Sequence, residues 1–182
     1  VYLRLQSEGS VQAPLSLWSA QAYLEALPAK VYVLGLIYGV LLGMLVYNLF
    51  IYVSVRDTSY LWYILYIASF GFYQLSVNGA AVAYFWPDSP WWANAATPLF
   101  IGAAGLFGCQ FARSFLQMRR HSRGFDRLLQ ALLACSVVVM AMSLASSYGL
   151  ALRLATALAL VFTVTIFVAG IKAWCCGCLL YT

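Results

Sequence analysis

The run GLIYGVLLGMLVYNLF, residues 35–50, decides the fold class of this chain. It is long, apolar and uncharged, and about 20 residues of this kind cross the hydrocarbon core of a bilayer as a helix. Gly35, Gly39 and Gly43 recur at every fourth position, and the next step of four falls on Tyr47, which Asn48 follows. Glycines four apart share one helix face and let a neighbouring backbone approach closely. The run therefore predicts a membrane span with a packing strip.

The composition extends this prediction to the whole chain. Hydrophobic residues make up 64% of the 182 residues and charged residues 8%, with a mean hydropathy of +0.86. Soluble domains carry about 25% charged residues, because their surface faces water. Since so few charges cannot cover a water-soluble globule, we expect an all-α polytopic membrane helix bundle.

Five stretches are long and apolar enough to span a membrane. We expect them to form a transmembrane bundle over residues 29–178, followed by a tail over residues 179–182. The fourth and fifth stretches are separated only by a tight turn around Gly149. The predicted spans are Val31–Val55, Tyr60–Phe85, Trp92–Leu116, Leu128–Tyr148 and Leu150–Trp174.

Residues 1–28 have a different pattern. VYLRLQS alternates apolar and polar residues like a half-buried strand, SEGS is a turn signal, and VQAPLSLW is a candidate second strand. We expect Ser19 to cap a short helix that Pro28 ends. An isolated hairpin is marginal in water, so these strands belong with others upstream. Because the chain also begins without Met, we expect it to be a fragment.

The basic residues predict the orientation in the membrane. With the N-terminus outside, only Arg4, Lys30 and Arg153 lie outside. An excess of Lys and Arg on the cytoplasmic side is the usual rule, so we expect the C-terminus in the cytoplasm. The basic loop could instead bind nucleic acid or anionic lipid, but topology already explains it. The basic residues expected inside are Arg56, Arg113, Arg119, Arg120, Arg123, Arg127 and Lys172.

Amide side chains lie among the apolar residues of three spans, and unpaired amides are costly in lipid. In the second span, Gln74 and Asn78 fall on one helix face with Gly71. We favour interhelical hydrogen bonds that fix packing, and a small polar pocket or switch is the alternative. Glycines three apart give the third span its own packing strip, Gly102, Gly105 and Gly108. The candidate pocket comprises Tyr38, Gln74, Asn78 and Gln110, and the candidate switch comprises Gly35, Gly39, Gly43, Tyr47 and Asn48.

The chain lacks the residues that are characteristic of several function classes. The five acids fall outside the predicted spans or at their ends, whereas proton-coupled transporters usually need an intramembrane carboxylate. His121 is the one histidine, which leaves no zinc site, haem pair or catalytic triad. We expect no enzyme activity, no cofactor and no metal. The cysteines near the end, Cys175, Cys176 and Cys178, form an incomplete zinc set, and we take them as incidental.

A series of short motifs resembles one known domain, in order and at the expected distances, from about Leu3 to Leu116. The chain is similar to the membrane domain of bacterial seven-transmembrane receptors with diverse intracellular signalling modules (7TMR-DISM). Its segment LRLQSEGS also resembles the last strands of the jelly-roll sensor domain that precedes the helices in that family. The motifs are Gly35-x-x-Tyr38-Gly39, Tyr47-Asn48-Leu49-Phe50, Arg56-Asp57-x-x-Tyr60-Leu61-x-Tyr63, Gly71-x-x-Gln74-Leu75-x-x-Asn78-Gly79, Trp86-Pro87 and Phe111-Ala112-Arg113-x-Phe115-Leu116.

The resemblance implies a receptor of the bacterial inner membrane that works as a homodimer. A β-sandwich sensor outside would bind a small, carbohydrate-like ligand, and a diguanylate cyclase or histidine kinase of a two-component system would respond inside. The partners implied are the lipid bilayer, the ligand and the receptor's own output domain, without nucleic acid. The family has seven spans where we count five, and the tail WCCGCLLYT differs from the basic segment expected there. The alternatives are a transporter or permease subunit, or a membrane scaffold.

Overall fold

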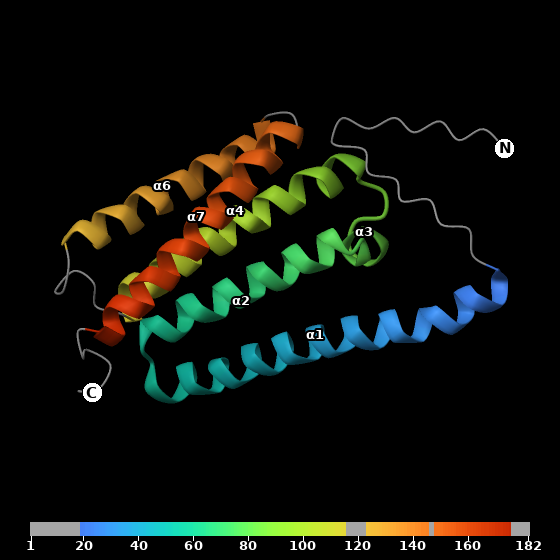
Figure 1. The fold of residues 1–182 in the computed structure, drawn as a ribbon, viewed down its shortest axis with the longest axis horizontal. Helices are drawn as coiled ribbons and strands as arrows, with labels where there is room; N and C mark the ends of the chain where they lie inside the picture. The colour runs from blue at the N-terminus through green and yellow to red at the C-terminus, as the bar shows by residue number, and fades with distance from the viewer. Residues whose placement is uncertain (1–18, 116–122, 146–147, 176–182) are drawn as a thin grey trace.

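The computed structural model describes residues 19–115, 123–145 and 148–175, and the chain in these ranges is helical apart from short turns. The all-α bundle expected from the composition is confirmed (Figure 1). The strands expected near the N-terminus fall in residues 1–18, outside the described residues. The helices are α1 (Ala20–Val55), α2 (Thr58–Val77), α3 (Ala80–Tyr84), α4 (Pro90–Phe115), α6 (Arg123–Ala145) and α7 (Tyr148–Cys175).

The long helices alternate in direction, so the bundle has two ends (Figure 1). At the Asn78 end, α2 and α6 finish while α4 and α7 begin. At the Arg113 end, α1 and α4 finish while α2 and α6 begin. The helix α1 starts beyond the Asn78 end and extends past α2 there (Figure 1).

Four helices are long and apolar enough to cross a membrane: Val31–Val55, Trp91–Phe115, Gly124–Ala145 and Gly149–Ile171. The second predicted span is not in this set, because the tyrosines of α2 lower its hydropathy. Its 20 residues nevertheless rise about 30 Å, which matches the hydrocarbon thickness. The helix packs between α1 and α4, and several of its aromatic rings lie against rings of α4. Tyr63 is 5.1 Å from Phe111 and Phe72 is 5.1 Å from Phe100, measured between ring centroids.

The structure corrects the single helix expected over residues 60–85. The helix ends at Val77, and Gly79 follows with a φ of 76°, in the left-handed region that terminates helices. The chain then forms the short helix α3 and reaches α4 through a turn containing Pro87. The asparagine–glycine pair thus separates one predicted span into two helices.

The expected helix stop at Pro28 is wrong. The helix α1 continues through Pro28 as one element of 36 residues. A proline inside a helix removes one backbone hydrogen bond and usually kinks or ends the helix, but it does not forbid continuation. The first predicted span is therefore the second part of a longer helix.

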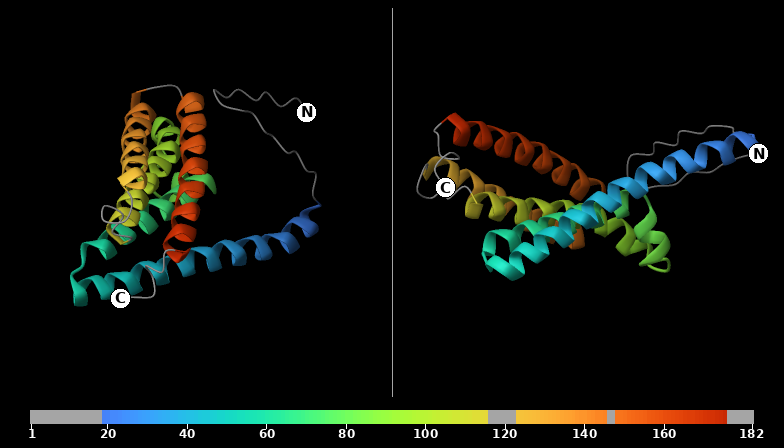
Figure 2. Two further views of the ribbon diagram at one scale, coloured as in Figure 1. Left: turned by 60° about the vertical axis from the view of Figure 1, so that its left-hand side comes forward. Right: turned by 90° about the horizontal axis from the view of Figure 1, so that it is seen from below.

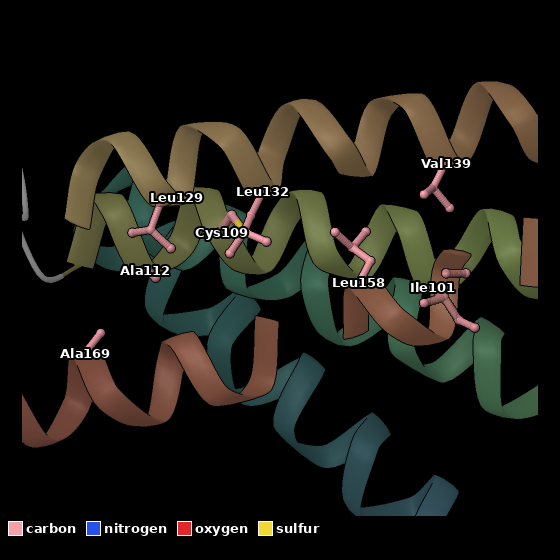
Figure 3. Close-up of a cluster of buried hydrophobic side chains, with 9 residues drawn as sticks. Ile101, Cys109, Ala112, Leu129, Leu132, Val139, Leu158 and Ala169 are labelled. Carbon is pink, nitrogen blue, oxygen red and sulfur yellow. The ribbon is translucent and has the colours of Figure 1, made fainter. Parts of the chain in front are cut away.

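The core of the bundle lies around α4, on which α2, α6 and α7 all pack. In the most apolar stretch of α4, 61% of the residues are buried, against 6% in α1. Figure 2 shows α1 inclined away from α4, α6 and α7, and it packs mainly on α2. The buried apolar cluster in Figure 3 comprises Ile101, Cys109 and Ala112 of α4, Leu129, Leu132 and Val139 of α6, and Ala155, Leu158 and Ala169 of α7.

Candidate functional site

The glycine strip of α4 lies inside the core. A Cβ atom added to Gly102 would lie 2.8 Å from Met140 Cγ and 3.3 Å from the Ser136 carbonyl oxygen of α6. At Gly108 it would lie 2.5 Å from Phe162 Cζ of α7 and 3.2 Å from Tyr66 Cδ2 of α2. Gly105, between them, is 3.0 Å from Ser136 Oγ by the same measure. These three glycines allow the neighbouring helices to approach α4 closely.

The glycine strip of α1 is open in the same structure. A Cβ atom added to Gly35, Gly39 or Gly43 would find no atom within 4 Å among the described residues. The strip therefore makes no close helix contact within the described part of this chain. Its role as a packing strip or switch stays a prediction.

Tyr47 and Asn48, the other members of the candidate switch, have different surroundings. Tyr47 is exposed, whereas Asn48 is buried and donates a hydrogen bond of 2.7 Å from Nδ2 to the carbonyl oxygen of Met44. That bond stays within α1, so Nδ2 has a partner without a second helix. Among the described residues, the structure shows no hydrogen bond from Asn48 to Gln74 or Asn78.

Three of the four residues of the candidate pocket meet at the Asn78 end. The Tyr38 hydroxyl of α1 accepts a hydrogen bond of 3.0 Å from Asn78 Nδ2 and donates one of 3.4 Å to the Gln74 carbonyl oxygen. Gln74 thus contributes its backbone rather than its side chain. We call Tyr38, Gln74 and Asn78 the tyrosine clamp, because they join α1 to the last turn of α2.

Gln110 lies at the opposite end of the bundle from this clamp. Arg113 Nη1 donates a hydrogen bond of 3.4 Å to Gln110 Oε1, and Arg113 Nε donates one of 2.8 Å to Asp126 Oδ1. Gln130 Nε2 donates to the other oxygen of Asp126, at 3.1 Å. The group links α4 to α6 through an ion pair, whose side chains are 23% exposed for Arg113 and 12% for Asp126.

Asp126 and Gln130 were not among the residues that the sequence singled out. Their spacing could have indicated a shared role, because residues four apart share a helix face and Asp126 stands in the first turn of α6. A carboxylate so near the membrane needs a counter-charge, and Arg113 ends the preceding span. Arg113, predicted only as a topology marker, therefore also holds two helices together.

The other basic residues of the predicted cytoplasmic group are only partly described. Arg119 and Arg120 fall in residues 116–122, outside the described ranges, while Arg123 begins α6 and Arg127 is exposed. Arg56 takes a left-handed φ of 56° between α1 and α2. Asp57 then caps α2 by accepting a hydrogen bond of 2.9 Å from the Ser59 backbone N–H. The adjacent Arg56 and Asp57 thus build the tight turn at the Arg113 end.

A cavity of about 460 Å³ lies between α2, α4 and α7. Aromatic rings of α2 and α7 line it together with Gly105, so it is suited to apolar groups. No group of three or more potential metal ligands occurs among the described residues. Cys175 is the last residue of α7, and the other cysteines of its cluster lie in the undescribed residues 176–182. The lining includes Tyr66, Phe70, Tyr73, Ile101, Ala104, Leu158 and Phe162.

The arrangement of helices agrees with what the comparisons with known proteins found. The family model described as 7TM diverse intracellular signalling matches residues 30–177, which is most of the chain. The chain belongs to this family. As a 7TM diverse intracellular signalling domain, it is a multi-pass membrane protein with a role in signalling. No curated protein and no solved structure matches the chain.

Proposed function

We propose that this domain is the membrane relay of a bacterial inner-membrane receptor. By this proposal, a small ligand, carbohydrate-like in chemistry, binds a sensor domain outside the membrane. The helix bundle then passes the change to a cytoplasmic output domain such as a diguanylate cyclase or a histidine kinase. The domain itself carries no catalysis, and two copies work together as a homodimer.

Family membership over residues 30–177 is the observation that carries this proposal. The shape of the bundle supports it, because α1 extends past the Asn78 end while α2, α4, α6 and α7 form the packed body. Such a helix suits a connection between an external domain and a membrane bundle. The same comparison gives no support for a transporter or a scaffold.

The distribution of charge supports the proposed orientation. Arg56, Arg113 and Arg127 all lie at the Arg113 end of the bundle. Basic residues concentrate on the cytoplasmic side of membrane proteins, so this end faces the cytoplasm by our proposal. The Asn78 end, with its cluster of Trp86, Trp91 and Trp92, then faces outward. Tryptophan prefers the headgroup layer, which suits that position.

The experiment that tests the proposal begins with the gene on both sides of this segment. We expect a sensor domain before it and a cyclase or kinase domain after it. The full-length protein is then placed in membrane vesicles, and the product of the output domain is measured with the sensor domain intact and deleted. A change in output upon deletion supports the relay. Output indifferent to the sensor, or substrate uptake without any output domain, contradicts it.

A further inference from the structure

The helix α1 is the least attached of the long helices. Its most apolar stretch is 6% buried, and no atom of the described residues lies within 4 Å of a Cβ added to its three glycines. The body formed by α2, α4, α6 and α7 is held by the α4 glycines, the buried cluster and the Arg113–Asp126 ion pair. Weak attachment lets one element move while the packed elements stay together.

The tyrosine clamp joins this loosely held helix to the body. Both of its hydrogen bonds use one atom of α1, the Tyr38 hydroxyl oxygen. By contrast, the buried Asn48 donates its hydrogen bond to its own helix. In the described part of the chain, the Tyr38 hydroxyl is therefore the one group that joins α1 to α2 by hydrogen bonds.

The clamp holds the place where α2 terminates. Asn78 is the C-cap residue that follows Val77, the last residue of that helix, and Gly79 then turns the backbone with its left-handed φ. Carbonyl groups in the last turn of a helix have no intrahelical partner of their own, or only a shared one. The Gln74 carbonyl accepts from the Asn78 backbone N–H and also from Tyr38. A shift of α1 would therefore change the hydrogen bonding of the α2 end directly.

We propose that Tyr38 is the positioning residue through which α1 acts on the bundle, with its hydrogen bonds to Asn78 and Gln74 made in one signalling state and broken in the other. The inference rests on the proposed relay function and specifies where the signal enters the body. A stimulus shifts such an equilibrium only by its difference in affinity for the two states. The hydrogen bonds between Tyr38 of α1 and the end of α2 can provide that difference.

A distance measurement tests the clamp independently of any output domain. Spin labels are attached at Tyr32→Cys, on an α1 side chain that is 77% exposed, and at the exposed Cys135 of α6. The cysteines at 175, 176 and 178 are replaced by serine, and the whole chain is held in lipid nanodiscs. We expect Tyr38→Phe to broaden or shift the distance distribution. Tyr52→Phe is the matched control, because Tyr52 is on the same helix and its hydroxyl makes no hydrogen bond among the described residues.

The functional arm uses the full-length receptor with its own output domain. Removing one interhelical hydrogen bond in a bilayer shifts a two-state equilibrium about threefold. Tyr38→Phe removes both bonds of the clamp, so it should change basal output by about eightfold. Asn78→Ala removes one of them and should change output about threefold in the same direction, and the double variant should do no more than Tyr38→Phe alone. Tyr52→Phe should leave output unchanged.

The outcomes separate the clamp from the relay. An unchanged distance distribution in Tyr38→Phe, an equal change in Tyr52→Phe, or fully additive effects of the two clamp substitutions would overturn the inference. A moved α1 with unaltered output would also overturn it, provided that wild-type output responds to deletion of the sensor. If wild-type output ignores the sensor, the relay proposal itself has failed, and the control identifies that case.

Discussion

The helices α1 and α4 each carry a strip of three glycines. The strip of α4 is packed against other helices, whereas the strip of α1 is open. The strip of α4 is filled by side chains and backbone of three other helices. The strip of α1, equally regular in sequence, has no atom of the described residues within 4 Å of an added Cβ. Sequence alone gave both the same interpretation, because a helix face without side chains favours close approach in lipid.

The spacing of the glycines explains part of the difference. A step of three residues falls about 60° short of a full turn, so a strip at that spacing winds around its helix. Gly102 accordingly meets α6, Gly105 meets α6 and α7, and Gly108 meets α7 and α2. A step of four exceeds a turn by only about 40°, which keeps Gly35, Gly39 and Gly43 closer to one face. A winding strip suits a central helix, whereas a straighter strip suits one partner.

The ion pair between α4 and α6 predicts the largest effect. Asp126→Ala leaves Arg113 without its carboxylate, and breaking a buried ion pair costs about 3–5 kcal/mol. We expect about 3 kcal/mol here, since both side chains keep some exposure. Thermal unfolding of the purified protein in detergent measures it. Arg127→Ala, one residue further along the same helix, should change little, and an equal loss there would show a general charge effect.

Filling the strip of α4 should have the next largest effect. Gly102→Leu places its side chain against Met140 and the Ser136 carbonyl, so the backbone of α6 has to retreat. Overpacking of this kind costs about 1–3 kcal/mol, and we expect a lower midpoint of thermal unfolding. Unaltered stability would mean that α4 and α6 are more loosely packed than the structure shows.

A hydrogen bond between α2 and α4 should contribute less. The hydroxyl oxygens of Ser59 and Ser114 lie 2.8 Å apart, and either hydroxyl can donate. Interhelical hydrogen bonds in membranes contribute about 0.6 kcal/mol, so Ser114→Ala should lower stability by roughly that amount. A double-mutant cycle with Ser59→Ala isolates the pair, and a coupling energy of zero would show that the bond contributes nothing.

Filling the strip of α1 should have the smallest effect on stability and the sharpest effect on signalling. Gly39→Leu meets no described atom, so stability should change by less than about 0.5 kcal/mol. If the strip is a switch, output of the full-length receptor should nevertheless be locked on or off while the protein still inserts. Normal signal response would rule the switch out. Destabilisation as large as that of Gly102→Leu would instead show that the strip is packed in the membrane.

The polar residues show how far sequence reasoning reached. Tyr38, Gln74 and Asn78 were expected to share a site, and the clamp brings them together, although Gln74 uses its carbonyl oxygen. Gln110 was grouped with them, yet it lies at the Arg113 end. The antiparallel order of the spans already separates these residues along the bundle. The partnership of Arg113 with Asp126 was not foreseen, because it joins two helices across a loop.

The sequence by itself determined the membrane environment, the helical class and the family. Every backbone polar group in hydrocarbon needs an internal partner, so apolar runs of this length become helices whatever their neighbours are. Only the tertiary structure decided which strip of glycines is packed, where Tyr38 binds and which charge neutralises Asp126. A glycine permits close approach of a helix and a hydroxyl permits a hydrogen bond, but the partner in each case depends on how the separate helices pack in space.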